Sequence, residues 1–207
     1  MASKGEELGL RTQVIPGLQT SLAFWRLDSD SELVYNSNSS IGSTEPNGAS
    51  KRHGIELNNH FVVGDWLLVD ADMAWTHARY ADSNANGEEG NYIANAVSRV
   101  GLLGITLPNL GPWSAGLVTR FIGSYPLSQD GKLTTPSSLV SNLQVKRNLT
   151  PWCAVSVDVL NLFNRRFYDM AYEQDYRVSP TSPIVPSGVT VHPGELREFR
   201  VSLNFKI

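Results

Sequence analysis

The sequence has very little of several things that would define common protein classes. Its single cysteine, Cys153, excludes a disulfide within the chain. No run approaches the roughly 18 apolar residues that a membrane helix requires. Charged residues make up only 18% of the 207 residues and hydrophobic residues 41%, so the chain does not have the composition of a disordered protein. The net charge of −3 and the lack of a basic block argue against nucleic-acid binding.

Motifs for catalysis are equally scarce. The sequence contains no Gly-x-Ser-x-Gly motif, no phosphate-binding loop and no cysteine pair. Asp70 and Asp72 lie two positions apart and could share a cation on one strand face, but solvated carboxylates are the simpler interpretation. Cys153 lies in an alternating strand and is expected to be an inert, packed thiol. The histidines are scattered without the spacing of metal ligands: His53, His60, His77 and His192. We therefore predict no enzyme activity, no catalytic, metal or cofactor-binding residues and no cofactor, and the sequence identifies no ligand-binding residues.

Period-two alternation is the main signal in the chain, and it is clearest at the C-terminus. Between Glu195 and Ile207 the apolar positions are Phe199, Val201, Leu203, Phe205 and Ile207. The alternate positions are Arg200, Ser202, Asn204 and Lys206. Such alternation predicts a β-strand with one apolar and one polar face. The same pattern recurs upstream and indicates an all-β chain of nine strands, at about 6–15, 19–35, 52–63, 66–80, 97–107, 113–125, 139–149, 153–164 and 195–207.

The connections between these strands alternate in length. Tight turns are expected at Pro16-Gly17, Gly64-Asp65, 108–112 and Thr150-Pro151, whereas polar loops are expected at 36–51, 81–93, 126–136 and 173–193. Short turns on one side and long loops on the other are typical of outer-membrane barrels. Predicted strand lengths of roughly 10 to 17 residues also exceed the 5 or 6 usual in soluble sheets. A tilted membrane crossing needs about 9 to 11 residues.

Aromatic residues support the same orientation. Trp66, Trp113 and Trp152 each follow a short turn, as expected for an aromatic girdle at one membrane interface. We expect the opposite girdle from Tyr80, Tyr125, Phe163 and Phe167. The alternative is that these aromatics lie at the edge of the core of a soluble sandwich. If the apolar face meets lipid, the lumen is lined by Asp70, Asp72, Arg120, Asn142, Gln144, Lys146, Asp158, Arg200, Asn204 and Lys206.

The final hairpin carries a more specific pattern. The run Cys153 to Asn164, CAVSVDVLNLFN, precedes Arg165, Arg166 and Phe167. With the terminal run ELREFRVSLNFKI it resembles the closing hairpin of TonB-dependent outer-membrane receptors, in which Asp158 and Asn161 match the family motif and have an expected structural role. Shorter stretches that resemble the same barrel are GEELGLRT at 5–12, PGLQTSLA at 16–23 and LVDADMAW at 68–75.

The resemblance implies a fold, a location and partners. Residues 1–207 would be one domain, the C-terminal part of an antiparallel up-and-down transmembrane β-barrel in the bacterial outer membrane. The family takes up scarce ligands such as iron–siderophore complexes. Partners implied by the resemblance are outer-membrane lipids, the barrel-assembly machinery and, in a full-length receptor only, the TonB complex and the plug domain. No plug, TonB box or signal peptide is recognisable, and Ile207 replaces the usual terminal aromatic residue.

The strand count has its own consequence. Complete bacterial barrels have an even number of strands, so nine strands predict a fragment of a larger barrel with two unpaired edges. A second copy of the chain could cover these edges as a homo-oligomer. The alternative hypothesis is a compact soluble or engineered β-barrel or binding protein derived from such a sequence, with a dry apolar interior and no transport activity.

Overall fold

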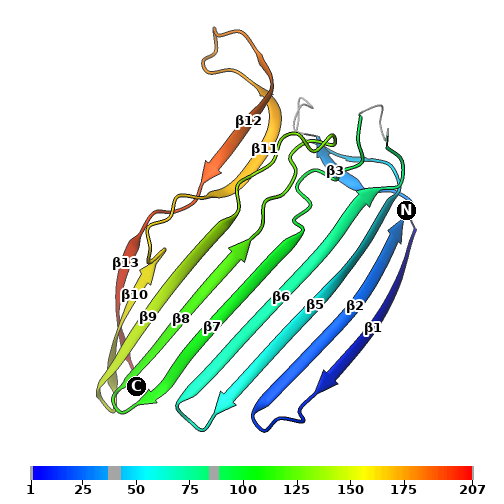
Figure 1. The fold of residues 1–207 in the computed structure, drawn as a ribbon. Coiled ribbons are helices and arrows are strands. Elements are labelled where there is room, and N and C mark those ends of the chain that lie inside the picture. Colours follow the sequence, from blue (N-terminus) through cyan, green and yellow to red (C-terminus); the bar gives the residue numbers. More distant parts are fainter. Residues whose placement is uncertain (1, 37–42, 84–88, 207) are drawn as a thin grey trace.

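The computed structural model of the chain describes residues 2–36, 43–83 and 89–206. Nine strands form one antiparallel sheet in the order β1-β2-β5-β6-β7-β8-β9-β10-β13 (Figure 1). Their bounds are β1 (Ser3–Thr12), β2 (Leu18–Ser29), β5 (Ser50–Val63), β6 (Leu67–Tyr80), β7 (Arg99–Leu110), β8 (Trp113–Ile122), β9 (Ser138–Thr150), β10 (Cys153–Leu160) and β13 (Glu198–Phe205). The all-β, up-and-down meander of nine strands is therefore confirmed. Within the described ranges no helix is long and apolar enough to cross a membrane.

Tight turns join the sheet strands at one end, where the sequence predicted them. Gly17 adopts φ +78° and Gly64 adopts φ +55° in the turns after β1 and β5. A Cβ atom on Gly17 would collide with the backbone carbonyl of Val62. Glycine is required there because only it tolerates both the left-handed backbone and the close approach.

Two of the predicted loops are in fact hairpins. β2 ends at Ser29 rather than near residue 35, and the last part of that predicted strand forms β3 (Leu33–Asn36), which pairs with β4 (Ser43–Pro46) in the region expected to be a loop. Residues 37–42 of that loop lie outside the described residues. The loop expected at 173–193 is also wrong, because β11 (Tyr168–Tyr176) pairs with β12 (Val185–Pro193) there. This hairpin has only two strands, so its prolines meet no second neighbour, and proline is tolerated on such edges.

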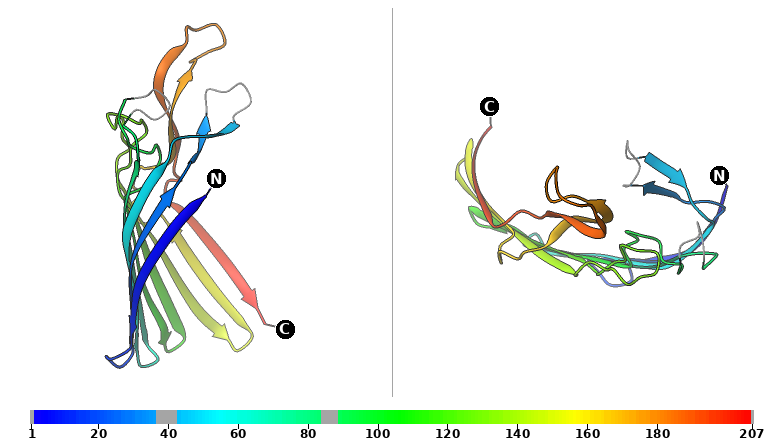
Figure 2. Two further views of the ribbon diagram at one scale, coloured as in Figure 1. Left: turned by 90° about the vertical axis from the view of Figure 1, so that its right-hand side faces the viewer. Right: turned by 90° about the horizontal axis from the view of Figure 1, so that it is seen from above.

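The sheet is open and curved, with β1 and β13 at its two edges. Viewed from above it forms an arc, and the β3–β4 and β11–β12 hairpins stand inside the arc (Figure 2). Residues of β11 line the same hollow as Arg52, Ile122 and Ser138 of the sheet. Because the β11–β12 hairpin stands inside the arc, the side chains of these three residues lie on the concave face. Register pairing then assigns every sheet position to a face.

The convex face carries the apolar side chains. Register places on it Leu10, Leu22, Leu57, Met73, Leu103, Leu117, Leu143, Val157, Val201 and Leu203. On β5 the convex positions from Ile55 to Val63 are apolar except for Asn59, and on β6 those from Leu67 to Trp75 are all apolar, so that each span is nine residues long. This length matches the roughly 9 to 11 residues of a tilted membrane crossing. The apolar side chains thus lie on the outer face of the sheet, whereas the soluble alternative requires them to fill a dry interior.

Trp66, Trp113 and Trp152 lie exposed at the tight-turn end of the sheet, as predicted. The Trp152 and Phe205 rings stack with centroids 6.2 Å apart, and the Arg147 guanidinium lies 4.9 Å from the Trp113 ring centroid. The predicted girdle at the other end is wrong for two of its members. Tyr80 is buried, and Tyr125 lines a hollow on the concave side, because the loops fold over them.

Candidate functional site

The polar side chains predicted to line a lumen share the concave face. Cross-strand pairing aligns Asp158 with Gln144 on one side and with Arg200 on the other. Asp70, Asp72, Arg120, Asn142, Lys146 and Asn204 fall on the same face by register, and Lys206 follows β13 directly. The prediction of one polar face is therefore confirmed for the residues that lie in strands.

These polar groups pair mainly with one another. Gln144 Nε2 donates to Asp158 Oδ1 over 2.6 Å. His60 Nδ1 lies 2.6 Å from Asp70 Oδ1, so Asp70 interacts with a cross-strand histidine. Sequence reasoning did not foresee this pair, since the two residues belong to different strands. The pair could have been found from the tight turn at Gly64, because the register of such a hairpin places His60 directly opposite Asp70.

The concave face is not polar throughout. Val100, Leu102 and Val118 on β7 and β8 are about as exposed there as the convex side chains, at 40%, 38% and 41%. β7 is apolar on both faces, which the one-sided alternation of the other strands did not lead us to expect. A shallow hollow of about 370 Å³ lies over this strip, beside Asp72 and Arg120.

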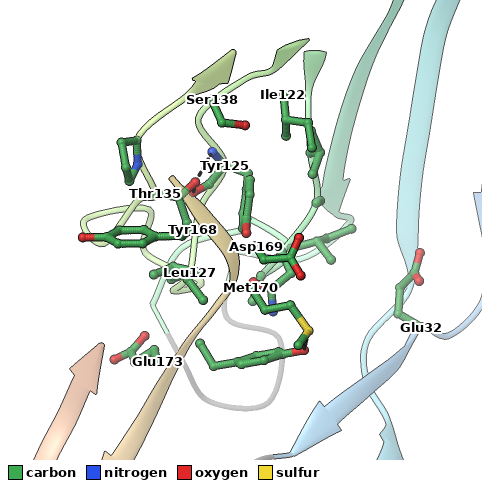
Figure 3. Close-up of a pocket in the computed structure, with 18 of the residues that line it drawn as sticks. Glu32, Ile122, Tyr125, Leu127, Thr135, Ser138, Tyr168, Asp169, Met170 and Glu173 are labelled. Atoms are coloured by element: carbon green, nitrogen blue, oxygen red, sulfur yellow. Dashed lines mark hydrogen bonds between the residues drawn. The ribbon is translucent and has the colours of Figure 1, made fainter. Parts of the chain in front are cut away.

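A larger hollow of about 510 Å³ lies at the loop end of the concave face (Figure 3). The β11 strand forms one wall, the loops around Asn95 and Leu127 form another, and sheet residues close the base. Its aromatic and thioether lining consists of Tyr125, Tyr168, Met170 and Tyr172. The sequence analysis predicted none of these residues as ligand contacts and placed Tyr125 in a membrane girdle, because the hollow depends on how the loops and the β11 hairpin fold back over the sheet.

Tight packing of the loops gives the hollow a fixed shape. Ala171 on β11 is only 2% exposed, and Leu127 is 4% exposed. Ala78, Tyr80 and Ile93 form a small buried cluster next to it, with Ala96 packed against them. The loops at this end are therefore ordered by an apolar core of their own.

The charged groups of the hollow are partly neutralised. Arg52 and Glu32 form a two-point ion pair, with Nε to Oε1 and Nη2 to Oε2 both at 3.0 Å. The Ser50 hydroxyl donates a further bond to Glu32. Asp169 and Glu173 are the other charged lining residues, so the Arg52 guanidinium is the one cationic side chain in the described lining. A small or amphipathic ligand would meet aromatic rings and a charge pair there.

Tyr125 supplies a neutral phenol to this hollow. Burial raises its pKa above the ordinary value, and the nearby Tyr172 adds to this shift. Its backbone N–H donates to Thr135 Oγ1 over 3.2 Å. The phenol therefore stays protonated at neutral pH and can act as a hydrogen-bond donor to a ligand.

Asn161 has a structural role, as predicted from the family motif. It is 3% exposed and adopts φ +46°. Its Nδ2 donates to the carbonyls of Arg165 and Glu195, and its Oδ1 accepts from the Arg165 N–H. Asn161 thereby holds the end of β10 against the segment that leads into β13.

No metal site emerges from the candidate ligands. The histidines lie apart: His60 with Asp70, His192 with Asp169 at 3.9 Å, and His53 beside His77 on the convex face. Within the part of the chain that the structure describes, no group of three histidine, cysteine or acidic residues is placed to hold a metal ion. Cys153 is half-buried and is not in a disulfide.

Comparison with known proteins gives one consistent fold. The family model "TonB dependent receptor-like, beta-barrel" matches residues 3–164. The ferric-catecholate import receptor Fiu of E. coli K12 superimposes with a TM-score of 0.72 at 19% identity, over 98% of this chain and 27% of that one. The ferric yersiniabactin uptake receptor FyuA of Yersinia pestis gives a TM-score of 0.75 at 14% identity, over 98% and 29%. The copper transporter OprC gives a TM-score of 0.72 at 18% identity, over 98% of this chain and 32% of that one. This chain thus spans less than a third of the length of each.

Proposed function

Because the chain belongs to the TonB-dependent receptor-like β-barrel family, we propose that it forms part of the barrel wall of a bacterial outer-membrane receptor that takes up a scarce ligand such as an iron–siderophore complex. The observation that supports this most is the division of the sheet into an apolar convex face nine residues deep and a concave face that carries paired polar groups. Tight turns at one end and packed loops at the other give the orientation of such a receptor.

The hollow under β11 is the proposed ligand contact of this part of the wall. Tyr125, Tyr168 and Tyr172 offer ring faces and hydroxyl groups, which suit a chelate with aromatic arms. Among the similar proteins, Fiu imports ferric catecholate, FyuA takes up ferric yersiniabactin and OprC transports copper. We propose for this protein a metal chelate, the class of ligand that the first two take up.

The open parts of the sheet suggest where further partners bind. Val100, Leu102 and Val118 leave an apolar strip exposed on the concave face, which a plug domain would cover in a full-length receptor. The β1 and β13 edges carry unpaired backbone groups that lipid cannot satisfy. We propose that further barrel strands or a second copy of the chain pair with them, and that the barrel-assembly machinery inserts the sheet.

Two measurements test this proposal. Circular dichroism of the chain in buffer and in detergent micelles should show folded β-structure only in micelles, whereas a folded monomer in plain buffer would contradict the outer-membrane assignment. Equilibrium binding of a ferric catecholate and a ferric phenolate to the micellar protein should then weaken roughly tenfold in Tyr168→Ala. Phe163→Ala is the matched control, because Phe163 is also exposed but does not line the hollow. If Tyr168→Ala and Phe163→Ala bind the chelates with equal affinity, the hollow is not the ligand site.

A further inference from the structure

The apolar band on the convex face ends abruptly on β5 and β6. The last apolar row pairs Ile55 with Trp75. The next convex row pairs His53 with His77, and the one after it pairs Lys51 with Arg79. Register therefore places a row of imidazoles and then a row of two cations directly beyond the stretch that fits a membrane crossing, at the level of lipid headgroups.

Charges on the neighbouring strands are already paired. On β1, Lys4 Nζ lies 3.0 Å from Glu6 Oε1, and on β2, Arg26 Nη2 lies 2.8 Å from Asp28 Oδ2. Both pairs belong to the same convex rows. They cancel each other locally, so β1 and β2 add no net charge to the rim.

The basic side chains on β5, β6 and β7 differ in this respect. Among the described residues, no salt bridge joins Lys51, Arg79 or Arg99 to a carboxylate, although Asp28 of β2 lies directly opposite Lys51 in the sheet. Arg79 lies over the ring of Tyr92, 3.8 Å from its centroid, and donates to the Ala78 carbonyl. Arg99 is exposed beside Trp75, its cross-strand partner. We call the cations Lys51, Arg79 and Arg99, together with the imidazoles of His53 and His77 between them, the cation patch.

Aromatic rings hold the centre of the cation patch in place. The ring centroids of His53 and His77 are 5.0 Å apart, and those of His53 and Trp75 are 5.9 Å apart. Tryptophan prefers the interface between hydrocarbon and headgroups. The patch thus has a cluster of tilted rings at the interface and three cations around it that form no salt bridge among the described residues, in a chain whose net charge is −3.

We propose that the cation patch binds the phosphate groups of a phosphorylated lipid in the outer leaflet. Basic side chains at the membrane surface attract anionic headgroups, and a guanidinium offers paired donors to phosphate. The position favours a lipid over a soluble anion, because the patch lies on the convex face and continues into the apolar side chains of Phe24, Ile55 and Trp75, against which acyl chains would pack. The assignment to the outer leaflet rests on the proposed function.

The test uses the full chain folded in micelles of a neutral detergent, with diphosphoryl lipid A as the probe. Native mass spectrometry and fluorescence titration would compare its binding with that of monophosphoryl lipid A and of phosphatidylcholine. We expect preference in that order, and a roughly 30-fold loss of diphosphoryl lipid A affinity in the double variant K51Q/R79Q. The control R120Q/K146Q removes the same charge from the concave face and should bind as the unchanged protein does.

Each outcome bears on a separate claim. Equal binding of the phosphorylated and neutral lipids, or equal losses in the two double variants, would overturn the lipid site. Binding of inorganic phosphate at the patch as tightly as lipid A would overturn the choice of a lipid. Circular dichroism recorded beforehand separates these results from the proposed function: a chain that fails to fold in micelles refutes both proposals, whereas a folded chain without lipid preference refutes the lipid site alone.

Discussion

Asn161 Nδ2 donates a 2.9 Å hydrogen bond to the backbone carbonyl of Glu195, which links the end of β10 to the segment before β13. The same amide group satisfies the carbonyl of Arg165. Asn161→Ala removes both bonds, at a cost of about 1 to 3 kcal/mol. Urea unfolding in micelles should show this loss, and Asn148→Ala, at an exposed position, should not. Equal midpoints for the two variants would rule out the bridging role.

The close contact at Gly54 gives a steric prediction. A Cβ atom there would lie 2.5 Å from the Trp75 carbonyl and 2.6 Å from the Trp25 ring. Gly54→Ala should therefore destabilise the sheet by about 1 to 3 kcal/mol and shift the fluorescence of Trp25. Gly116→Ala is the control, because its nearest neighbour would be Thr106 Oγ1 at 3.9 Å. The idea fails if both alanine variants unfold at the same denaturant concentration.

The orientation of the two faces can be tested with neighbouring residues. Leu57 lies on the convex face of β5 and Asn58 on the concave face. Arginine on a lipid face costs about 2 to 4 kcal/mol near the membrane midplane, whereas lumen positions tolerate it. Leu57→Arg should lower the folded fraction in phosphatidylcholine vesicles, and Asn58→Arg should leave it near that of the unchanged protein. The opposite ranking would mean that the concave face meets the lipid.

The Glu32–Arg52 ion pair should control which chelates the hollow accepts. Glu32→Gln removes the carboxylate that occupies both Arg52 donors at 3.0 Å and so leaves the guanidinium for a ligand. Affinity for an anionic ferric catecholate should rise on the order of tenfold, as expected for a new charge-assisted hydrogen bond. Equilibrium binding measures it, with Glu56→Gln as a concave control outside this hollow. Unchanged affinity in Glu32→Gln would show that Arg52 does not contact the ligand.

Asp130 gives a pH dependence in the loop between β8 and β9. The Ser128 hydroxyl, the Lys132 N–H and the Lys132 ammonium hold the pKa of its carboxyl well below the ordinary value. A lowered folded-state pKa means that the loop stabilisation is complete above about pH 4, the unfolded pKa, and is lost as the pH falls through the folded pKa. Carboxyl NMR titration should give a midpoint below the ordinary range, and Ser128→Ala should raise it. Titration at the ordinary value would show that these bonds do not form in solution.

The sequence alone was sufficient for the sheet but not for what lies inside it. Alternation such as Phe199, Val201 and Leu203 against Arg200 and Ser202 fixes strand and face together, because the side-chain period is two. Turn residues such as Gly17 and Gly64 then place the tight ends.

The hairpins and the hollow escaped prediction because they depend on contacts between loops. Proline and polar residues made 173–193 look irregular, whereas β11 and β12 pair there with no third strand to exclude proline. Tyr80 and Tyr125 sit at the ends of strands, where alternation no longer decides the face. The sequence suggested solvated carboxylates at Asp70 and Asp72, or a cation shared between them, whereas in the structure Asp70 lies 2.6 Å from His60 across the hairpin.

The order of the strands has a kinetic meaning. Every neighbouring pair in the sheet joins consecutive sheet strands of the chain, and a whole hairpin intervenes twice, between β2 and β5 and between β10 and β13. The connection from β10 to β13, residues 161–197, is the longer of the two, because residues 30–49 join β2 to β5. Local pairings form faster than distant ones because they close shorter loops. Assembly can therefore proceed hairpin by hairpin from β1 to β10, with the docking of β13 as its slowest step. The hydrogen bond from Asn161 to Glu195 lies where that last pairing begins, so its formation would fix the register in which β13 pairs with β10.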